Sequence, residues 1–238
     1  MRLFYLAARG IVFADRNEHK RVGHLEPQPM IGGDLATRYP LRVVAGILRD
    51  QSELADWLLE RKQQFPHGTE EINMVLKQTH SSQTMTTSCG RVLDAVSAIL
   101  GVCYERTYEG EPAMKLESVA IGGEDVLRIE PVLKGEVIET TSIIREIFMS
   151  TERFGVRDLA CSAQSYLARS LSKSAITAAN EQGIKTIGFT GGVACNEAIM
   201  HILRATVESE GLRFLVHEAV PPGDGGLSFG QAVVAAQS

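Results

Sequence analysis

The sequence predicts an α/β protein built as one lobe, with a mainly helical segment inserted into it. Three observations lead to this prediction. Three short β-prone segments stand close together near the start, a long helix-rich stretch follows, and strands alternate with helices over the last third. With the insertion set aside, the expected order is β-β-β-α-β-α-β-α.

The first strands are predicted from short apolar runs separated by turn residues. The expected strands are Leu3–Ala7, Gly10–Ala14 and Lys20–Leu25. The turns between them are Arg9–Gly10 and the polar segment Asp15–Glu18. Such short connections join only antiparallel neighbours, so we expect a meander. Prolines and glycines at positions 27–33 then break regular structure.

The second part, residues 34–154, is predicted to be a mainly helical insertion subdomain. Apolar residues recur there at helical spacing, with Ser52 as one expected N-cap and Gly101 as one expected helix end. A short strand is expected at Val126–Ile129. The expected helices are residues 53–59, 69–76, 91–100, 113–120 and 140–148. The α/β lobe itself is then formed by residues 1–33 plus 155–238.

The last third alternates between helices and strands. The expected elements are helix 156–182, strand Lys185–Phe189, helix Asn196–Ser209, strand Arg213–His217 and helix Leu227–Ala236. Strands separated by helices pair in parallel through right-handed crossovers. This order is that of one ribonuclease-H-like lobe, the unit that is duplicated in actin and hexokinase. The chain has room for one such unit.

Composition narrows the class of protein. The hydrophobic share is 44%, the charged share is 22% and the formal net charge is -5, so no broad positive field would attract nucleic acid or an anionic membrane. The apolar run after Met1 is too short for a signal peptide or a membrane span. The four cysteines have no metal-binding spacing. We expect a soluble, cytoplasmic protein with reduced thiols and with neither a nucleic-acid nor a membrane partner.

Two glycine turns follow the last two predicted strands. In Thr190–Asn196, glycines allow backbone N–H groups to approach an anion at a helix N-terminus, although such a segment is also a common tight turn and Asn196 a common helix cap. In Pro222–Gly226, Asp224 could hold a divalent cation or simply begin a turn. Because both turns lie at the carboxyl ends of adjacent parallel strands, they are expected to face one ligand crevice.

Several motifs, in order from about Val12 to the end, resemble the hydrogenase maturation carbamoyltransferases of the HypF type. Thr87–Val96 resembles the family's T-S-x-G-R-L-F-D-A-V segment, and Tyr108–Met114 resembles its Y-E-G-x-A-A segment. Arg21–Pro27 with Gly32–Asp34 is similar to R-V-A-H-L-x-P and P-G-G-D. The two terminal glycine turns also match.

The resemblance implies a second lobe of a two-lobed, actin-like carbamoyltransferase domain. Its reaction moves a carbamoyl group from carbamoyl adenylate, made elsewhere from carbamoyl phosphate and ATP, to the C-terminal cysteine of a HypE-type partner, and AMP is released. The implied ligands are ATP, AMP or carbamoyl adenylate and a divalent metal. The implied nucleotide contacts are Gly90, Asp94, Gly110, Gly191, Gly192 and Asn196, and the implied metal ligand is Asp224. An aspartate on an amphipathic helix more often faces solvent, and this alternative stays open for Asp94.

Departures from the family pattern favour an incomplete site. No two histidines have the H-x-x-x-H spacing of the family's metal-binding pair, which belongs to the opposite lobe, and Ala7–Gly10 replaces an Asp-Gly-Thr-Gly phosphate turn. We therefore expect part of an enzyme, completed by a separate first lobe or by a homodimer. The alternative is a non-catalytic relative that binds a nucleotide or a partner. A bare lobe should also expose an apolar face that drives pairing.

Overall fold

The computed structural model describes residues 3–7, 10–14 and 19–236, and these form two compact units. The first unit comprises the strands of the first 25 residues with 131–138 and 167–236, and the second comprises 26–130 and 139–166. The predicted turn Asp15–Glu18, and Ala8–Arg9 of the predicted first turn, lie outside the described residues. The predicted domain boundaries at 33/34 and 154/155 stay predictions.

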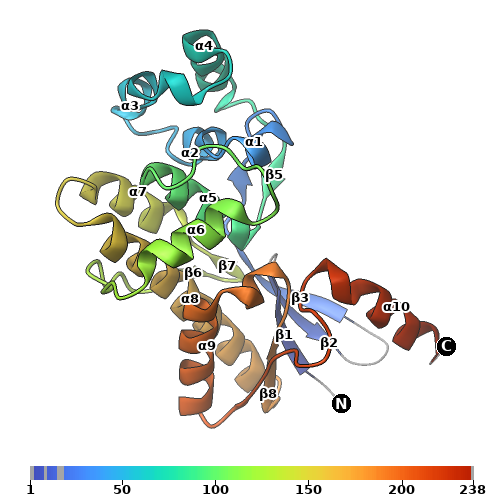
Figure 1. Cartoon of the computed structure of the whole chain (residues 1–238). Coiled ribbons are helices and arrows are strands. Elements are labelled where there is room, and N and C mark those ends of the chain that lie inside the picture. Colours follow the sequence, from blue (N-terminus) through green and yellow to red (C-terminus); the bar gives the residue numbers. More distant parts are fainter. Residues whose placement is uncertain (1–2, 8–9, 15–18, 237–238) are drawn as a thin grey trace. The chain divides into compact units, whose positions relative to one another are not determined.

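The first unit contains a seven-stranded mixed sheet, as predicted for an α/β lobe (Figure 1). Its strands are β1 (Leu3–Ala7), β2 (Gly10–Ala14), β3 (His19–Leu25), β6 (Leu133–Lys134), β7 (Val137–Ile138), β8 (Thr186–Phe189) and β9 (Arg213–Leu215). The order is β6-β7-β3-β2-β1-β8-β9. The antiparallel β1-β2-β3 meander and the parallel pairing of β8 with β1 and β9 were both predicted.

The helices of the first unit are α9 (Glu197–Ser209), α10 (Leu227–Ala235) and the carboxyl-terminal part of α8 (Val156–Glu181). Helix α9 buries Ile199, Leu203 and Val207, which recur every four residues along one face. A 3₁₀ turn precedes each of the last two helices: η2 (Gly192–Cys195) and η3 (Asp224–Gly226). Each predicted strand–turn–helix connection is thus present.

The predicted strand at Val126–Ile129 is wrong. That segment is irregular: the backbone N–H of Leu127 donates to Ser162 Oγ at 3.3 Å, and Arg128 adopts a positive φ of 46°. The strands instead follow it, because Gly135, with φ 62°, makes the tight turn between β6 and β7. The apolar run at 126–129 satisfies its backbone through side chains and does not form a sheet ladder.

The second unit is mainly helical, as predicted, with a two-stranded ladder. Its helices are α1 (Leu35–Arg38), α2 (Leu41–Ile47), α3 (Leu54–Glu60), η1 (Lys62–Gln64), α4 (Gly68–Gln78), α5 (Cys89–Ile99), α6 (Glu111–Ala120), α7 (Thr141–Ser150) and the start of α8; its strands are β4 (Gln28–Pro29) and β5 (Met85–Thr86). Gly101 ends α5 with φ 72°, as expected. Ser52 makes no cap hydrogen bond, because α3 begins one residue later.

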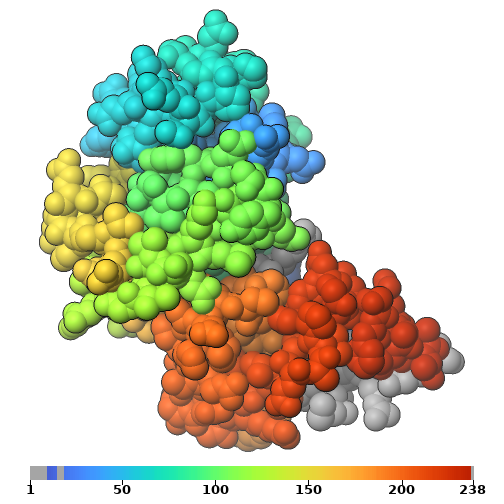
Figure 2. All heavy atoms as spheres, viewed as in Figure 1, coloured from blue at the N-terminus to red at the C-terminus, as the bar shows by residue number. Residues whose placement is uncertain are grey.

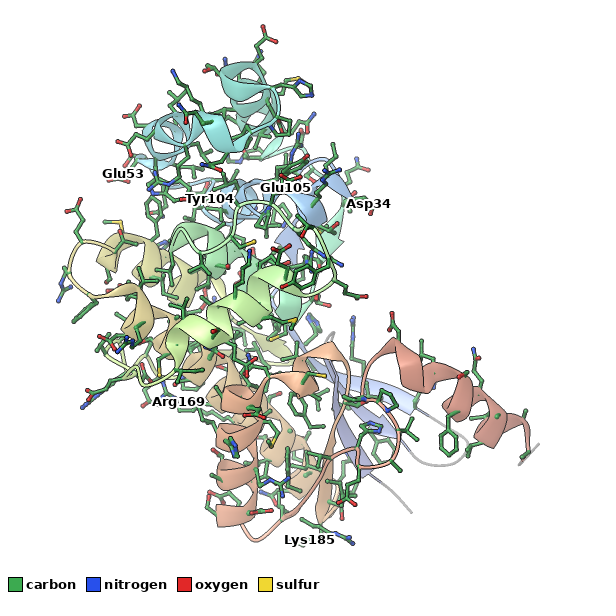
Figure 3. All side chains as sticks on the ribbon, in the orientation of Figure 1. Asp34, Glu53, Tyr104, Glu105, Arg169 and Lys185 are labelled. Atoms are coloured by element: carbon green, nitrogen blue, oxygen red, sulfur yellow. The ribbon has the colours of Figure 1, made fainter. Side chains whose placement is uncertain are left out.

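Buried polar pairs fix parts of this helical unit. Arg42, in the fully buried α2, donates from Nε and Nη2 to Glu71 Oε1 at 3.0 and 2.6 Å. Glu105, labelled in Figure 3, accepts from Arg38 Nη2 at 2.8 Å and ties the segment after α5 to α1. The first pair is buried and the second is exposed. Only the buried pair leaves a costly uncompensated charge when one partner is removed.

Of the described residues, no helix is both long and apolar enough to cross a bilayer. The cysteines carry free thiols; Cys89 and Cys103 are buried, Cys161 is partly exposed and Cys195 is exposed.

Candidate functional site

The two glycine turns of the first unit lie side by side and are joined by hydrogen bonds. The backbone N–H of Gly191 donates to the carbonyl oxygen of Pro222 at 2.7 Å, and Thr190 Oγ1 donates to the same oxygen at 3.2 Å. Strands β8 and β9 are parallel neighbours, so their following turns meet at one sheet edge. The structure thus brings the two predicted half-motifs together, while their ligand roles remain predictions.

Gly191 and Gly192 leave the backbone of the first turn open to an approaching group. Gly191 has φ 85°, a conformation that L side chains rarely adopt. A Cβ built on Gly192 would meet nothing within 4 Å. The first glycine is therefore required by the turn itself, whereas the second keeps free space beside the backbone, as contact with a phosphate would need.

Asn196 is the N-cap of α9. Its Oδ1 accepts a hydrogen bond from the backbone N–H of Ile199 at 2.8 Å, and the residue is buried. The sequence analysis named helix capping as one possible role of Asn196, and this hydrogen bond confirms it. The N-terminus of α9, which carries the positive end of the helix dipole, directly follows the glycine turn in the chain.

Asp224 is exposed at the first position of η3, before α10. A Cβ on Gly226 would lie 2.4 Å from the carbonyl oxygen of Pro221, so the turn closes too tightly for any side chain there. Among the described residues, no three His, Cys, Asp or Glu side chains gather as metal ligands would. Asp224 could supply one ligand, but the described residues place no second and third His, Cys, Asp or Glu ligand beside it.

Thr190 and His217 are site residues that the sequence analysis did not select. His217 Nε2 lies 2.9 Å from Thr190 Oγ1. Which of the two groups donates in this contact depends on the tautomer of the imidazole. Both residues come just after neighbouring parallel strands, and this position in the sequence could have indicated that they lie close together.

Asp94 and Gly90 lie on α5 in the second unit. Asp94 is fully buried, so the alternative of a solvent-facing aspartate is wrong. Its Oδ2 is 2.8 Å from Arg91 Nη2, yet neither carboxylate oxygen has an aligned hydrogen bond. Burial raises the pKa of Asp94 to about 6, although Arg91 and Arg106 oppose this. A buried carboxylate without hydrogen bonds is costly unless a ligand completes it.

Gly110 is the N-cap of α6, with φ 78°. The next residue, Glu111, accepts hydrogen bonds from the backbone N–H and the hydroxyl of Thr107 at 2.6 and 2.7 Å, and pairs with Lys115 at 2.7 Å. Hydrogen bonds from Lys115 and from Thr107 lower its pKa to about 2. The loop that presents Gly110 is thus held by an ionised carboxylate at the start of the helix.

The predicted nucleotide contacts therefore fall into two groups. Helices α5 and α6 pack together in the second unit and carry Gly90, Asp94 and Gly110. The first unit carries Gly191, Gly192, Asn196 and Asp224. Each group forms a coherent local arrangement by itself.

Comparison with known families places this geometry in context. Residues 10–231 match the model described as "Carbamoyltransferase, Kae1-like Domain, second subdomain". The chain is 41% identical over 227 residues to the probable carbamoyltransferase HypF of Methanocaldococcus jannaschii, and 31% identical over 229 residues to the carbamoyltransferase HypF of Rhodobacter capsulatus. These alignments cover 94% and 95% of the chain, but 29% of each relative.

Two solved structures are similar over nearly the whole chain. The crystal structure of T. kodakarensis HypF matches with a TM-score of 0.87 and 35% identity, covering 98% of this chain and 34% of that one. A full-length HypF, described as phosphate- and nucleotide-bound, matches with a TM-score of 0.87 and 25% identity, covering 100% and 33%. The chain thus spans about a third of the length of each of these four proteins.

Proposed function

This chain belongs to the HypF-type carbamoyltransferases, as the second subdomain of their Kae1-like domain, and we propose that it supplies half of a carbamoyl-transfer site. The substrate is carbamoyl adenylate. The acceptor is the C-terminal cysteine of a HypE-type hydrogenase-maturation partner. The chain is incomplete alone, and a first subdomain supplies the remainder.

In the proposed step, the cysteine thiolate attacks the carbamoyl carbon of carbamoyl adenylate. A carbon–sulfur bond forms, the bond from that carbon to the phosphate oxygen breaks, and AMP leaves with the electron pair. Charge develops on the phosphate, so donors aimed at this group assist the reaction. The Gly191 N–H is already bound to Pro222, so the turn that follows it, at Gly192, and the N-terminal end of α9 are the part of this unit that could offer such donors.

The observation that carries this proposal is the joining of the two glycine turns through the Gly191–Pro222 hydrogen bond. It keeps the open space beside Gly192 in the same part of the sheet edge as the Asp224 turn. The nucleotide-bound relative of the same fold supports the choice of ligand.

A metal would be held in part by Asp224. A divalent cation bound there would offset the charge of the phosphate. The described residues contain no group of three His, Cys, Asp or Glu side chains that could hold a metal, and in this proposal the first subdomain supplies further ligands. What this chain contributes is therefore an exposed carboxylate on a rigid glycine turn.

Calorimetric titration of the chain with AMP, with and without Mg²⁺, tests the nucleotide half-site. We expect weak binding that is lost in Gly191→Ala, because a side chain strains the turn and obstructs the phosphate. Gly211→Ala is the matched control, since Gly211 also has a positive φ, of 71°, and lies beyond α9. Equal loss in both variants would show a folding defect and no specific role for Gly191.

Transfer itself is tested in a chimera in which this chain replaces the matching segment of the M. jannaschii relative. The readout is the mass gain of one carbamoyl group on the C-terminal cysteine of the relative's maturation partner. We expect transfer by the chimera and none with Asp224→Ala. A chimera that folds and binds AMP yet transfers nothing would favour the second candidate, a non-catalytic nucleotide- or partner-binding relative. The replacement of the family's Asp-Gly-Thr-Gly turn by Ala7–Gly10 favours that candidate.

A further inference from the structure

Two arginines of the second unit are attached to the same short helix, α1. The Nη1 group of Arg91, on α5, donates to the carbonyl oxygen of Thr37 at 3.4 Å. The backbone N–H of Arg106, in the loop after α5, donates to the carbonyl oxygen of Arg38 at 2.7 Å. Burial lowers the pKa of Arg91, and the charge of Arg106 also acts to lower it. Neighbouring carbonyl groups of α1 thus hold Arg91 and Arg106, here called the arginine pair, near one another.

Most of the hydrogen-bonding capacity of the arginine pair is unused within the described part of the chain. A guanidinium group has five N–H bonds in a planar fork. Nη2 of Arg91 is 2.8 Å from Asp94 Oδ2, but its N–H bonds are not aligned with that carboxylate. Arg106 donates from Nε to the carbonyl oxygen of Tyr108 at 3.1 Å, and its Nη groups have no acceptor among the described residues. The pair can therefore donate to a further oxyanion.

The charge around the arginine pair is also predominantly positive. One buried carboxylate, that of Asp94, lies beside two guanidinium groups that both act on its pKa. Glu109 acts on Arg91 too, but it is exposed and its charge is screened by water. Arg106 is half-buried, so a ligand can reach it from solvent. Figure 2 shows the green part of the chain, around positions 100–120, at the surface beside the blue residues that contain α1.

Two stable anions take part in the proposed reaction: the phosphate of the adenylate and the C-terminal carboxylate of the acceptor. Donors for the phosphate are assigned above to the first unit. A planar guanidinium fits a carboxylate through two parallel hydrogen bonds. We propose that Arg91 and Arg106 bind the C-terminal carboxylate of the acceptor, an inference that rests on the proposed function for the identity of that acceptor.

This assignment makes the arginine pair a determinant of specificity. A terminal cysteine carries its thiol and its carboxylate on the same residue, so binding of the carboxylate also positions the sulfur. A cysteine within a chain has a neutral amide at that place and leaves the two guanidinium charges without a counterion. One extra residue after the cysteine would move the carboxylate by about 3.5 Å, beyond hydrogen-bonding reach.

Two peptides with the C-terminal sequence of the relative's maturation partner test the proposal, one ending in a carboxylate and the other in an amide. Calorimetric titration measures their affinities for the M. jannaschii chimera. We expect the carboxylate peptide to bind at least about tenfold more tightly. Equal affinities, or no binding of either peptide at millimolar concentration, would overturn the proposal.

Arg106→Gln in the chimera should abolish the difference between the two peptides. It should still fold, because the backbone N–H that binds the Arg38 carbonyl remains. Arg49→Gln is the matched control, since the Arg49 side chain is 37% exposed in the same unit, and it should keep the difference. A difference that survives Arg106→Gln would contradict the assignment.

Removal of Arg91 needs a compensated variant. Arg91→Gln alone leaves Asp94 as a buried charge without its ion pair, which can unfold the chain. The double variant Arg91→Gln with Asp94→Asn removes both charges and should also reduce the difference between the peptides. If the folded double variant kept the full difference, Arg91 would not belong to the carboxylate site.

Titration with AMP distinguishes a carboxylate site from a phosphate site. Arg106→Gln should leave the affinity for AMP unchanged. Weaker AMP binding in this variant, with equal binding of the two peptides to the unsubstituted chimera, would mean that the arginine pair binds phosphate and that the proposal is wrong. None of these readouts needs carbamoyl transfer. Preferential binding of the carboxylate peptide without any transfer would therefore contradict the proposed function and leave the carboxylate site in place.

Discussion

Helices α9 and α10 follow the same kind of connection but differ in how much apolar surface they bury. Each comes after a parallel strand and a glycine turn in the first unit. Helix α9 lies along the strands and buries three apolar side chains, whereas α10 extends away from them and buries none (Figure 1). Asn196 caps α9 with a side-chain hydrogen bond, and Gly226 at the start of α10 has no side chain to do so.

The difference shows which parts of the lobe are complete within this chain. Burying one large apolar side chain stabilises a fold by about 1.5–3 kcal/mol, and α9 obtains this from its own sheet. The same kind of side chains on α10 gain less, because Leu227, Phe229, Val233 and Val234 stay 39–66% exposed. Within the described part of the first unit, exposed large apolar side chains gather on α10, and the expectation that such a face drives pairing stays a prediction.

The largest expected effect comes from matched leucine truncations in the two helices. Leu203→Ala in α9 removes a fully buried side chain and should lower the free energy of unfolding by about 2–5 kcal/mol. Leu227→Ala in α10 should change it by less than about 0.5 kcal/mol, because that side chain is mainly exposed. Urea denaturation of both variants measures the comparison. Similar losses would mean that α10 packs on this chain after all.

The buried carboxylate of Asp94, in the helical unit, has an ion pair with Arg91 but no aligned hydrogen bond, and its titration can be measured. Its pKa is raised by burial from 3.8 to about 6, so the folded state holds a proton that the unfolded state has lost. Stability from this group is therefore highest below about pH 4 and falls by about 3 kcal/mol as the pH rises to 6.

The measurement for Asp94 is the urea midpoint of wild type and Asp94→Asn at several pH values. The stability of wild type relative to the variant should rise as the pH falls from 6 to 4. Asp56→Asn, an exposed aspartate on α3, should show no such trend. A flat difference for Asp94→Asn would mean that Arg91 compensates the buried charge fully.

Removal of the α9 cap has a smaller expected effect. Asn196→Ala loses the hydrogen bond to Ile199 N and should destabilise the fold by about 0.5–2 kcal/mol. Asn196→Asp keeps the acceptor and should restore stability, but its negative charge should weaken AMP binding. Thermal unfolding of the variants measures the capping role, and calorimetric titration with AMP measures the ligand-binding role. If Asn196→Asp bound AMP as wild type does, the phosphate would not lie near this cap.

Local rules were sufficient for much of the fold. Short apolar runs separated by turn residues predicted the meander, and the alternation of strands with helices predicted the parallel strands. The position of Asn196 before a helix predicted a cap. The apolar run at 126–129 was misread, because tertiary context determines whether such a run forms a strand.

The candidate site was only partly visible from the sequence. Motif spacing selected Gly191 and Asp224, and the pairing of their turns followed from strand order. The contact between Thr190 and His217 depends on distances across the two turns, and the burial of Asp94 depends on the packing around α5. Neither has a local signature. The exposure of α10 was expected only as an apolar face somewhere on the lobe.

AMP titration of the isolated chain and of the M. jannaschii chimera, under the same conditions, tests the central claim most directly. If this chain holds half of a site that a first subdomain completes, the chimera should bind AMP at least about tenfold more tightly, about 1.4 kcal/mol. Equal affinities in the two proteins would contradict the account.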